Sequence, residues 1–247
     1  MHKRTLGAAF GVFFALALVC QSGVAGPPFF TDDPEPVEYR HWEFYLASAQ
    51  QYFQHEVDAT LPHLEINYGA FHGVQFHLMA PMGYVRADDR TTYGFSNTEI
   101  GVKYRFIEEN DNRPQIGTFP LVEIPTGDRE KQLGNGKVQA FLPVWLQKRW
   151  GKFTTYGGVG YWFNPGGDTK NWVFAGWQAQ YDLSESLTLG GELWYHTADA
   201  LDGESGAAFN VGGFINIDES NHLLFSAGHS IRGEATTTVY LGYQLTL

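Results

Sequence analysis

Histidines and carboxylates are the residues of this sequence whose types and spacing could carry chemistry. His63 and Glu65 stand two residues apart, and His77 follows in the next polar stretch. Such groups bind zinc or transfer protons when they converge on one point. A β-strand, however, places residues i and i+2 on one face whatever their role. This spacing therefore predicts polar neighbours on a strand more strongly than a metal site, and we expect neither a metal nor a cofactor.

A hydrolytic site is the other chemistry to test. A serine nucleophile and a histidine base on one strand must be two residues apart to share a face. None of the nine histidines is followed by serine at that distance, and His229 and Ser230 are adjacent, so they would face opposite ways. We therefore expect that the protein is not an enzyme.

Alternation of apolar and polar residues dominates the chain from Trp42 onward. In one stretch Ile100, Val102 and Tyr104 share a face, while Glu99 and Lys103 share the other. A period of two is the pattern of a β-strand. It predicts twelve strands, near 42–52, 60–68, 74–86, 96–106, 115–124, 138–148, 153–163, 171–181, 187–197, 207–216, 222–231 and 238–247.

Composition and connections indicate where these strands reside. Charged residues make up 17% of the chain and aromatic residues 16%, and no apolar run after residue 26 is long enough for a spanning helix. Short connections alternate with longer polar ones such as 53–59 and 87–95. The pattern predicts an all-β fold, a transmembrane antiparallel up-and-down β-barrel of about twelve strands with both termini in the periplasm. A soluble periplasmic β-protein remains the alternative.

The two ends of the chain favour the same location. Lys3 and Arg4 precede an apolar stretch and small residues near residue 26, which is typical of a secretory signal peptide. Residues 239, 241, 243, 245 and 247 are all apolar, and this last strand resembles the closing strand that the outer-membrane assembly machinery recognises. We expect three regions: a signal peptide at 1–26, an N-terminal extended segment at 27–40, and an outer-membrane barrel at 41–247.

The polar strand faces would line the barrel lumen. The candidates are Glu43, Glu65, His77, Glu99, Lys103, Arg105, Glu123, Arg149, Glu192, Trp194 and His196. Lys103, Arg105 and Arg149 gather toward the periplasmic end, with Glu43 and Glu65 at similar height. They would form either a network of ion pairs that braces the barrel or a selective constriction.

The segment 27–38 is rich in proline, which argues against a helix or an internal strand. It is either a disordered leader or an extended plug in the periplasmic mouth. The formal net charge of −11 argues against nucleic acid as a partner, because binding to phosphates needs a basic surface. The expected partners are outer-membrane lipids, the assembly machinery and a small-molecule ligand.

Two short motifs carry a family resemblance. The stretch Pro28-Phe29-Phe30-Thr31-Asp32-Asp33-Pro34 and the stretch Ile124-Pro125-Thr126-Gly127-Asp128 occur together with the barrel pattern. In these features the sequence resembles the family of bacterial outer-membrane proteins named for a putative meta-pathway of phenol degradation. The resemblance implies a transporter-like barrel linked to uptake of aromatic or hydrophobic compounds. The expected function is passive passage or binding of such a small molecule, and the alternative is a closed barrel with a structural or surface-interaction role.

Overall fold

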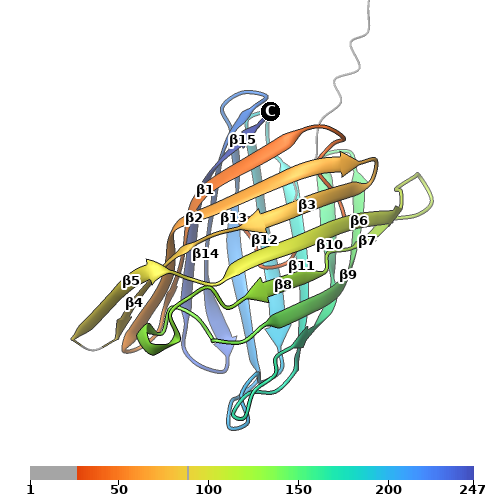
Figure 1. Cartoon of the computed structure of the whole chain (residues 1–247). Helices are drawn as coiled ribbons and strands as arrows, with labels where there is room; N and C mark the ends of the chain where they lie inside the picture. Colours follow the sequence, from red (N-terminus) through yellow and green to blue (C-terminus); the bar gives the residue numbers. More distant parts are fainter. Residues whose placement is uncertain (1–26, 88) are drawn as a thin grey trace, which may run out of the picture.

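The computed structural model describes residues 27–87 and 89–247, so the predicted signal peptide lies outside the described residues. The described chain forms one closed antiparallel β-barrel (Figure 1). Its strand segments are β1 (Trp42–Tyr52), β2 (Glu56–Phe71), β3 (Val74–Met79), β4 (Met82–Ala87), β5 (Arg90–Phe95), β6 (Thr98–Ile107), β7 (Gln115–Thr118), β8 (Leu121–Ile124), β9 (Gln139–Trp150), β10 (Phe153–Phe163), β11 (Trp172–Asp182), β12 (Leu187–His196), β13 (Gly206–Asn216), β14 (Asn221–Arg232) and β15 (Thr237–Thr246). A short 3-10 helix, η1 (Arg129–Lys131), lies in a loop.

Consecutive strands pair with each other around the barrel, and β1 pairs with both β2 and β15, which closes the ring. Three wall strands are each broken into two segments, namely β3 with β4, β5 with β6, and β7 with β8. The fifteen segments therefore make twelve wall strands, and the predicted fold class is confirmed.

Proline explains two of the three breaks. Pro81 separates β3 from β4, and Pro120 separates β7 from β8. A proline has no N–H to give to the ladder, so regular pairing stops there. Both prolines still accept hydrogen bonds through their carbonyls, from Ser96 N–H at 3.0 Å and from Val102 N–H at 3.1 Å.

Two predicted loops, 53–59 and 87–95, are wrong in part. Strand β2 already begins at Glu56, and most of 87–95 belongs to the β4–β5 hairpin. Residues 56–60 of β2 pair with β4, which in turn pairs with β5. The hairpin extends beyond the wall at the end of the barrel opposite to the C-terminal residue (Figure 1). These stretches lack a continuous apolar face, so the sequence pattern alone did not mark them as strands.

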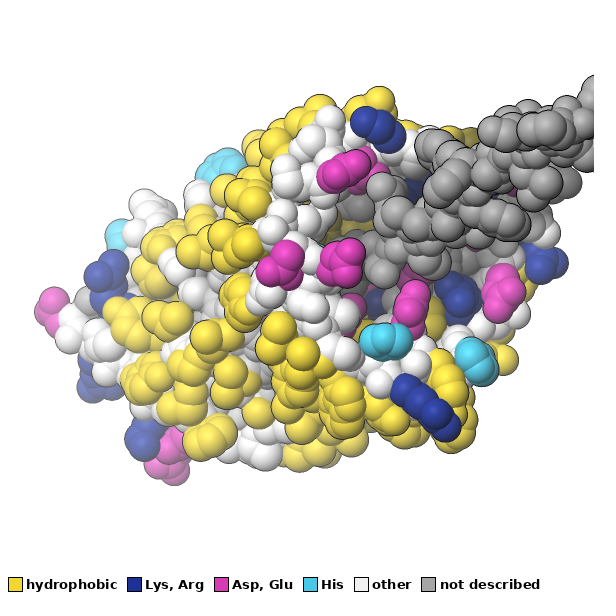
Figure 2. All heavy atoms as spheres, turned by 90° about the horizontal axis from the view of Figure 1, so that it is seen from above, with side chains coloured by type: hydrophobic (Ala, Val, Ile, Leu, Met, Phe, Trp, Pro, Cys, Tyr) yellow, Lys and Arg dark blue, Asp and Glu magenta, His cyan; other side chains and the backbone are white. Residues whose placement is uncertain are grey.

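The two faces of the wall differ in chemistry. Leu46, Leu193 and Leu241 point outward and are more than half exposed, whereas Gln178 and Gln244 point inward and are fully buried. Seen from the end that holds the C-terminal residue, hydrophobic side chains cover much of the visible outer wall and charged side chains gather near the mouth (Figure 2). An apolar exterior around a polar interior is the inverse of a soluble sandwich and suits a barrel surrounded by lipid.

No helix in the described part of the chain has the length and apolarity needed to cross a membrane.

Candidate functional site

Residues 27–41, which we call the lumen segment, precede β1; residues 27–37 run inside the barrel, and residues 38–41 are exposed (Figure 1). Thr31 and Asp33 have no exposed surface, and Phe29 and Val37 are buried as well. The segment belongs to no strand and has no ladder of its own. Arg40 and His41 exchange backbone hydrogen bonds with Gly69 of β2, and the position of residues 27–37 is set by contacts with inward side chains of the wall.

Acidic residues of the lumen segment pair with basic residues of β6. The Nζ atom of Lys103 lies 2.9 Å from Oδ1 of Asp32 and 3.7 Å from Oδ1 of Asp33. Arg105 Nη1 lies 3.5 Å from Oε1 of Glu35. These pairs neutralise the two cations that β6 presents to the lumen.

Glu192 on β12 holds the far end of the lumen segment. Its carboxylate accepts hydrogen bonds from the N–H groups of Phe30 at 2.9 Å and Thr31 at 2.8 Å, and also from the Asn210 amide. Charge-assisted bonds of this kind are stronger than neutral ones. Glu192 therefore satisfies two backbone donors that would otherwise be buried without a partner.

Two further wall residues bind the segment backbone. Gln75 accepts from the Val37 N–H at 2.9 Å, and the Ser226 hydroxyl donates to the Pro28 carbonyl at 2.6 Å. Glu35 also receives bonds from the amide groups of wall glutamines. The lumen segment is thus bonded to strands on several sides of the barrel.

Inward glycines leave room for the lumen segment. A Cβ atom on Gly69 would overlap the carbonyl oxygen of Glu38, and one on Gly176 would overlap the Thr31 hydroxyl. A glycine at such a site permits close approach of another backbone. These positions therefore shape the wall around the segment.

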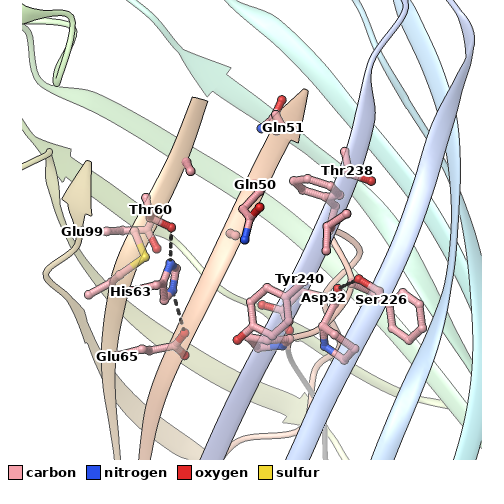
Figure 3. A pocket seen from close by; sticks show the side chains of 18 of the residues that line it. Asp32, Gln50, Gln51, Thr60, His63, Glu65, Glu99, Ser226, Thr238 and Tyr240 are labelled. Carbon is pink, nitrogen blue, oxygen red and sulfur yellow. Dashed lines mark hydrogen bonds and ion pairs between the residues drawn. The ribbon is translucent and has the colours of Figure 1, made fainter. Parts of the chain in front are cut away.

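A cavity of about 450 Å³ remains in the lumen beside this segment (Figure 3). Residues 27–30 and Asp32 form one side of it. The other lining residues come from seven strands and their flanks: Ala49, Gln50, Gln51, Asp58, Ala59, Thr60, His63, Glu65, His77, Met79, Glu99, Phe119, Leu121, Ser226, Thr238, Val239 and Tyr240. Its size falls in the range of small-molecule sites.

His77 stands between two carboxylates on the cavity wall. Its Nε2 atom lies 3.1 Å from Oε1 of Glu99, and its Nδ1 atom lies 3.5 Å from Oε1 of Glu65 and 2.8 Å from Oδ1 of Asn67. Because both ring nitrogens face oxygen acceptors, the geometry suits an imidazolium that donates on both sides. Within the described residues, no group of three or more His, Cys, Asp or Glu side chains is arranged to hold a metal ion.

Aromatic side chains line the wall across β9 to β12. Phe141 stacks on Trp162 with ring centroids 4.8 Å apart, and Trp162 stacks on Trp172 at 5.5 Å. Trp194 contacts Phe30 of the lumen segment at 5.2 Å. Four adjacent strands contribute rings to this aromatic surface. The rings contact one another because the register of the strands places them at the same height.

The predicted lumen residues are distributed over several sites. Glu65, His77 and Glu99 meet at the cavity, whereas Lys103, Arg105, Glu192 and Trp194 contact the lumen segment. Glu43 accepts a bond from the Tyr45 hydroxyl, and Glu123 accepts from Asn97 and Asn135. Arg149 pairs with Asp182 at 2.8 Å, and His196 contacts Trp172 and Trp194.

Glu43 lies near enough to Lys103 to interact with it electrostatically, but the ion-pair partners of the three basic residues are other acids. Neither Glu43 nor Glu65 forms an ion pair with Lys103, Arg105 or Arg149 within the described residues. The partners are Asp32, Asp33 and Glu35 of the lumen segment, together with Asp182. The run of acidic residues in 32–38 was the sequence feature that could have indicated these partners. It does not, however, reveal that the segment lies inside the barrel.

Comparisons with known proteins agree with this architecture. The model of the family described as "Putative MetA-pathway of phenol degradation" matches residues 53–247. No curated protein matches the sequence significantly.

Solved structures share the fold at low sequence identity. The COG4313 outer membrane channel from Pseudomonas putida F1 is 14% identical with a TM-score of 0.71, over 87% of this chain and 98% of that one. The KdgM porin is 12% identical with a TM-score of 0.58, over 82% and 98% of the two chains. The NanC porin is 9% identical with a TM-score of 0.58, over 83% and 100%. At this identity the similarity concerns the fold.

Proposed function

The chain belongs to the family of the putative MetA-pathway of phenol degradation, and from this premise we propose that it is a passive outer-membrane channel for small aromatic or hydrophobic compounds. The closed barrel with its apolar exterior is an outer-membrane structure. Passage of a ligand, its chemical class and the absence of catalysis are parts of this proposal.

The observation that carries the proposal is the difference between the wall and the lumen segment. The wall is closed by continuous backbone ladders from β1 to β15. Residues 27–37 of the lumen segment are held through wall side chains instead, and this part borders the cavity. Movement of this segment would therefore open the lumen without breaking the barrel.

The aromatic surface supports the proposed ligand class. Phe30 and Trp194 contact each other where the segment meets the wall, and Phe119 borders the cavity. Aromatic rings favour stacked or edge-to-face contacts with other rings. An aromatic compound that enters the lumen would meet such partners from the cavity to β12.

A closed barrel with a structural role is the second candidate, because the lumen segment fills part of the interior. Single-channel recording separates the two. We expect small, intermittent currents from the full chain in planar bilayers and larger, steadier currents from a variant that lacks residues 27–40. Benzyl alcohol, as an aromatic probe, should cause transient blocks of the current.

Silent bilayers for both proteins would contradict the channel. Folding of the shortened variant is checked first, through the resistance of the barrel to unfolding in cold detergent.

A further inference from the structure

The lumen cavity has an unequal balance of charge. Four carboxylates line it, from Asp32, Asp58, Glu65 and Glu99. Among the described residues that line the cavity, none is lysine or arginine. The cationic groups available on the lining are the two histidines, His63 and His77.

Nearby groups compensate these carboxylates only in part. Lys103 pairs with Asp32 from outside the lining. His77 lies between Glu65 and Glu99, and His63 Nε2 lies 3.6 Å from Glu65. Three cations are thus the most that can face four carboxylates, even with both histidines protonated.

Asp58 is the carboxylate left over. It forms no ion pair with any residue in the described part of the chain. It lies on β2 beside Thr60 and opposite Gln51 of β1, with Val85 of β4 on its other side. The cavity therefore keeps at least one negative charge that the protein does not neutralise.

The remainder of the cavity surface combines uncharged polar side chains, such as Gln50 and Thr238, with apolar and aromatic ones. Phe29 and Phe30 contribute from the lumen segment, and Phe119 and Leu121 from the opposite wall. The Tyr240 hydroxyl is buried with no hydrogen-bond partner in the described structure, and the Tyr240 side chain borders the cavity (Figure 3). A ligand with an apolar body and a polar group would satisfy both kinds of surface.

We propose that this cavity is a binding site for small organic cations, that is, protonated amines on a compact aromatic or apolar body. The ammonium group pairs with the carboxylates around Asp58 and Glu99, and the body packs on Phe29, Phe30 and Phe119. Asp58 is solvent-exposed, and carboxylates that line a cleft without lysine or arginine raise the local concentration of cations and repel an anion of the same shape. The inference deepens the proposed channel function and rests on it for the route into the site.

Three probes with the same ring but different charge test the site: benzylammonium, benzyl alcohol and benzoate. Isothermal titration of the purified full chain in detergent should give benzylammonium at least about tenfold tighter binding than benzoate, which corresponds to about 1.4 kcal/mol. Benzyl alcohol should fall between them. Equal affinities for benzylammonium and benzoate would overturn the inference.

Substitutions in the cavity test which carboxylates cause the preference for benzylammonium. Asp58→Asn and Glu99→Gln should each weaken benzylammonium binding several-fold and leave benzyl alcohol binding nearly unchanged. The control is Glu219→Gln, an exposed carboxylate in the turn between β13 and β14, which should bind like the unmodified chain. Unchanged benzylammonium binding in both cavity variants would also overturn the inference. If either variant fails to fold, the three-probe comparison on the unmodified chain decides alone.

Bilayer recording keeps the two proposals apart. Titration reports on the site, and current reports on the channel. A charge preference in titration without any current supports the site and contradicts the channel. Current without a charge preference supports the channel and contradicts the site.

Discussion

The Nζ atom of Lys103 lies 2.9 Å from Oδ1 of Asp32, so an ion pair joins the barrel wall to a segment 71 residues earlier in the chain. The Lys103 side chain is 3% exposed, which keeps the pair away from bulk water. A buried pair that loses one partner leaves an uncompensated charge behind. A single substitution that removes one partner should therefore weaken the docking of the lumen segment in the barrel.

The first prediction concerns this pair. Lys103→Met should release the lumen segment, because Asp32 and Asp33 would then lie in the lumen without their cation; removing one partner of a buried pair costs about 3–5 kcal/mol. Limited proteolysis of the segment and single-channel open probability should both rise. Lys131→Met, which removes an exposed pair with Asp128, is the control and should change neither. Equal protection of the segment in both variants would count against the role of Lys103.

The second prediction concerns pH. Burial raises the pKa of the Asp33 carboxyl to about 7, while the nearby Lys103 ammonium acts in the lowering direction. Released from the lumen, the carboxyl returns to its ordinary value of 3.8. Between pH 3.8 and pH 7, the docked segment therefore binds a proton at Asp33 that the released segment does not. The stability of docking is then greatest at low pH, falls as pH rises toward 7, and is constant above 7.

Open probability measured between pH 5 and pH 8 checks this direction. It should rise toward pH 7 and then level off. Asp33→Asn should remove this part of the pH dependence, because an amide does not titrate. The same rise in the Asp33→Asn variant would assign the effect to another group.

The third prediction concerns the space under the lumen segment. Gly176→Val should displace Thr31, because even a Cβ atom at this position would overlap the Thr31 hydroxyl. The wall should still close, since valine suits a strand. Larger currents from a barrel that still resists unfolding in cold detergent are the expected result. Gly167→Val, at a site with nothing within 4 Å of the added Cβ, should behave like the unmodified chain.

The fourth prediction concerns the lipid face. Leu193 points outward from β12 and is 61% exposed. Leu193→Arg should cost about 2–4 kcal/mol of barrel stability near mid-depth. Gln51→Arg, on the lumen cavity, should cost much less. Folding into lipid vesicles over a urea series measures both, and equal costs would contradict the assigned faces.

The fifth prediction concerns the seam. β15 pairs with β1 through Glu43 and Thr246, and Trp42 exchanges backbone hydrogen bonds of 2.8 and 2.9 Å with Leu247. Deleting residues 244–247 should leave edges of β1 and β14 unpaired in lipid, which is costly. The shortened chain should be degraded or aggregated before insertion, as the proposed recognition of this strand by the assembly machinery also requires. Normal membrane levels of the shortened chain would refute both points.

Sequence periodicity was enough to determine the number of wall strands and their two faces, but not every strand boundary. The predicted strand 153–163 coincides with β10, and Ile100 and Lys103 lie on the outward and inward faces as expected. This works because successive side chains of a strand alternate in direction. Most of β4 falls within the predicted strand 74–86, but β5 was predicted as loop, because its residues do not form a continuous apolar face.

Tertiary structure alone decided which inward residues meet. The alternation of apolar and polar residues predicts that Arg105 points inward. It does not predict that the ion-pair partner of Arg105 is Glu35 rather than Glu43. The lumen segment has no periodic pattern, and Ser226 binds it from 198 residues away. Such contacts depend on closure of the barrel and on the register of every strand between the two residues. Together these set the height of each inward side chain and its position around the lumen.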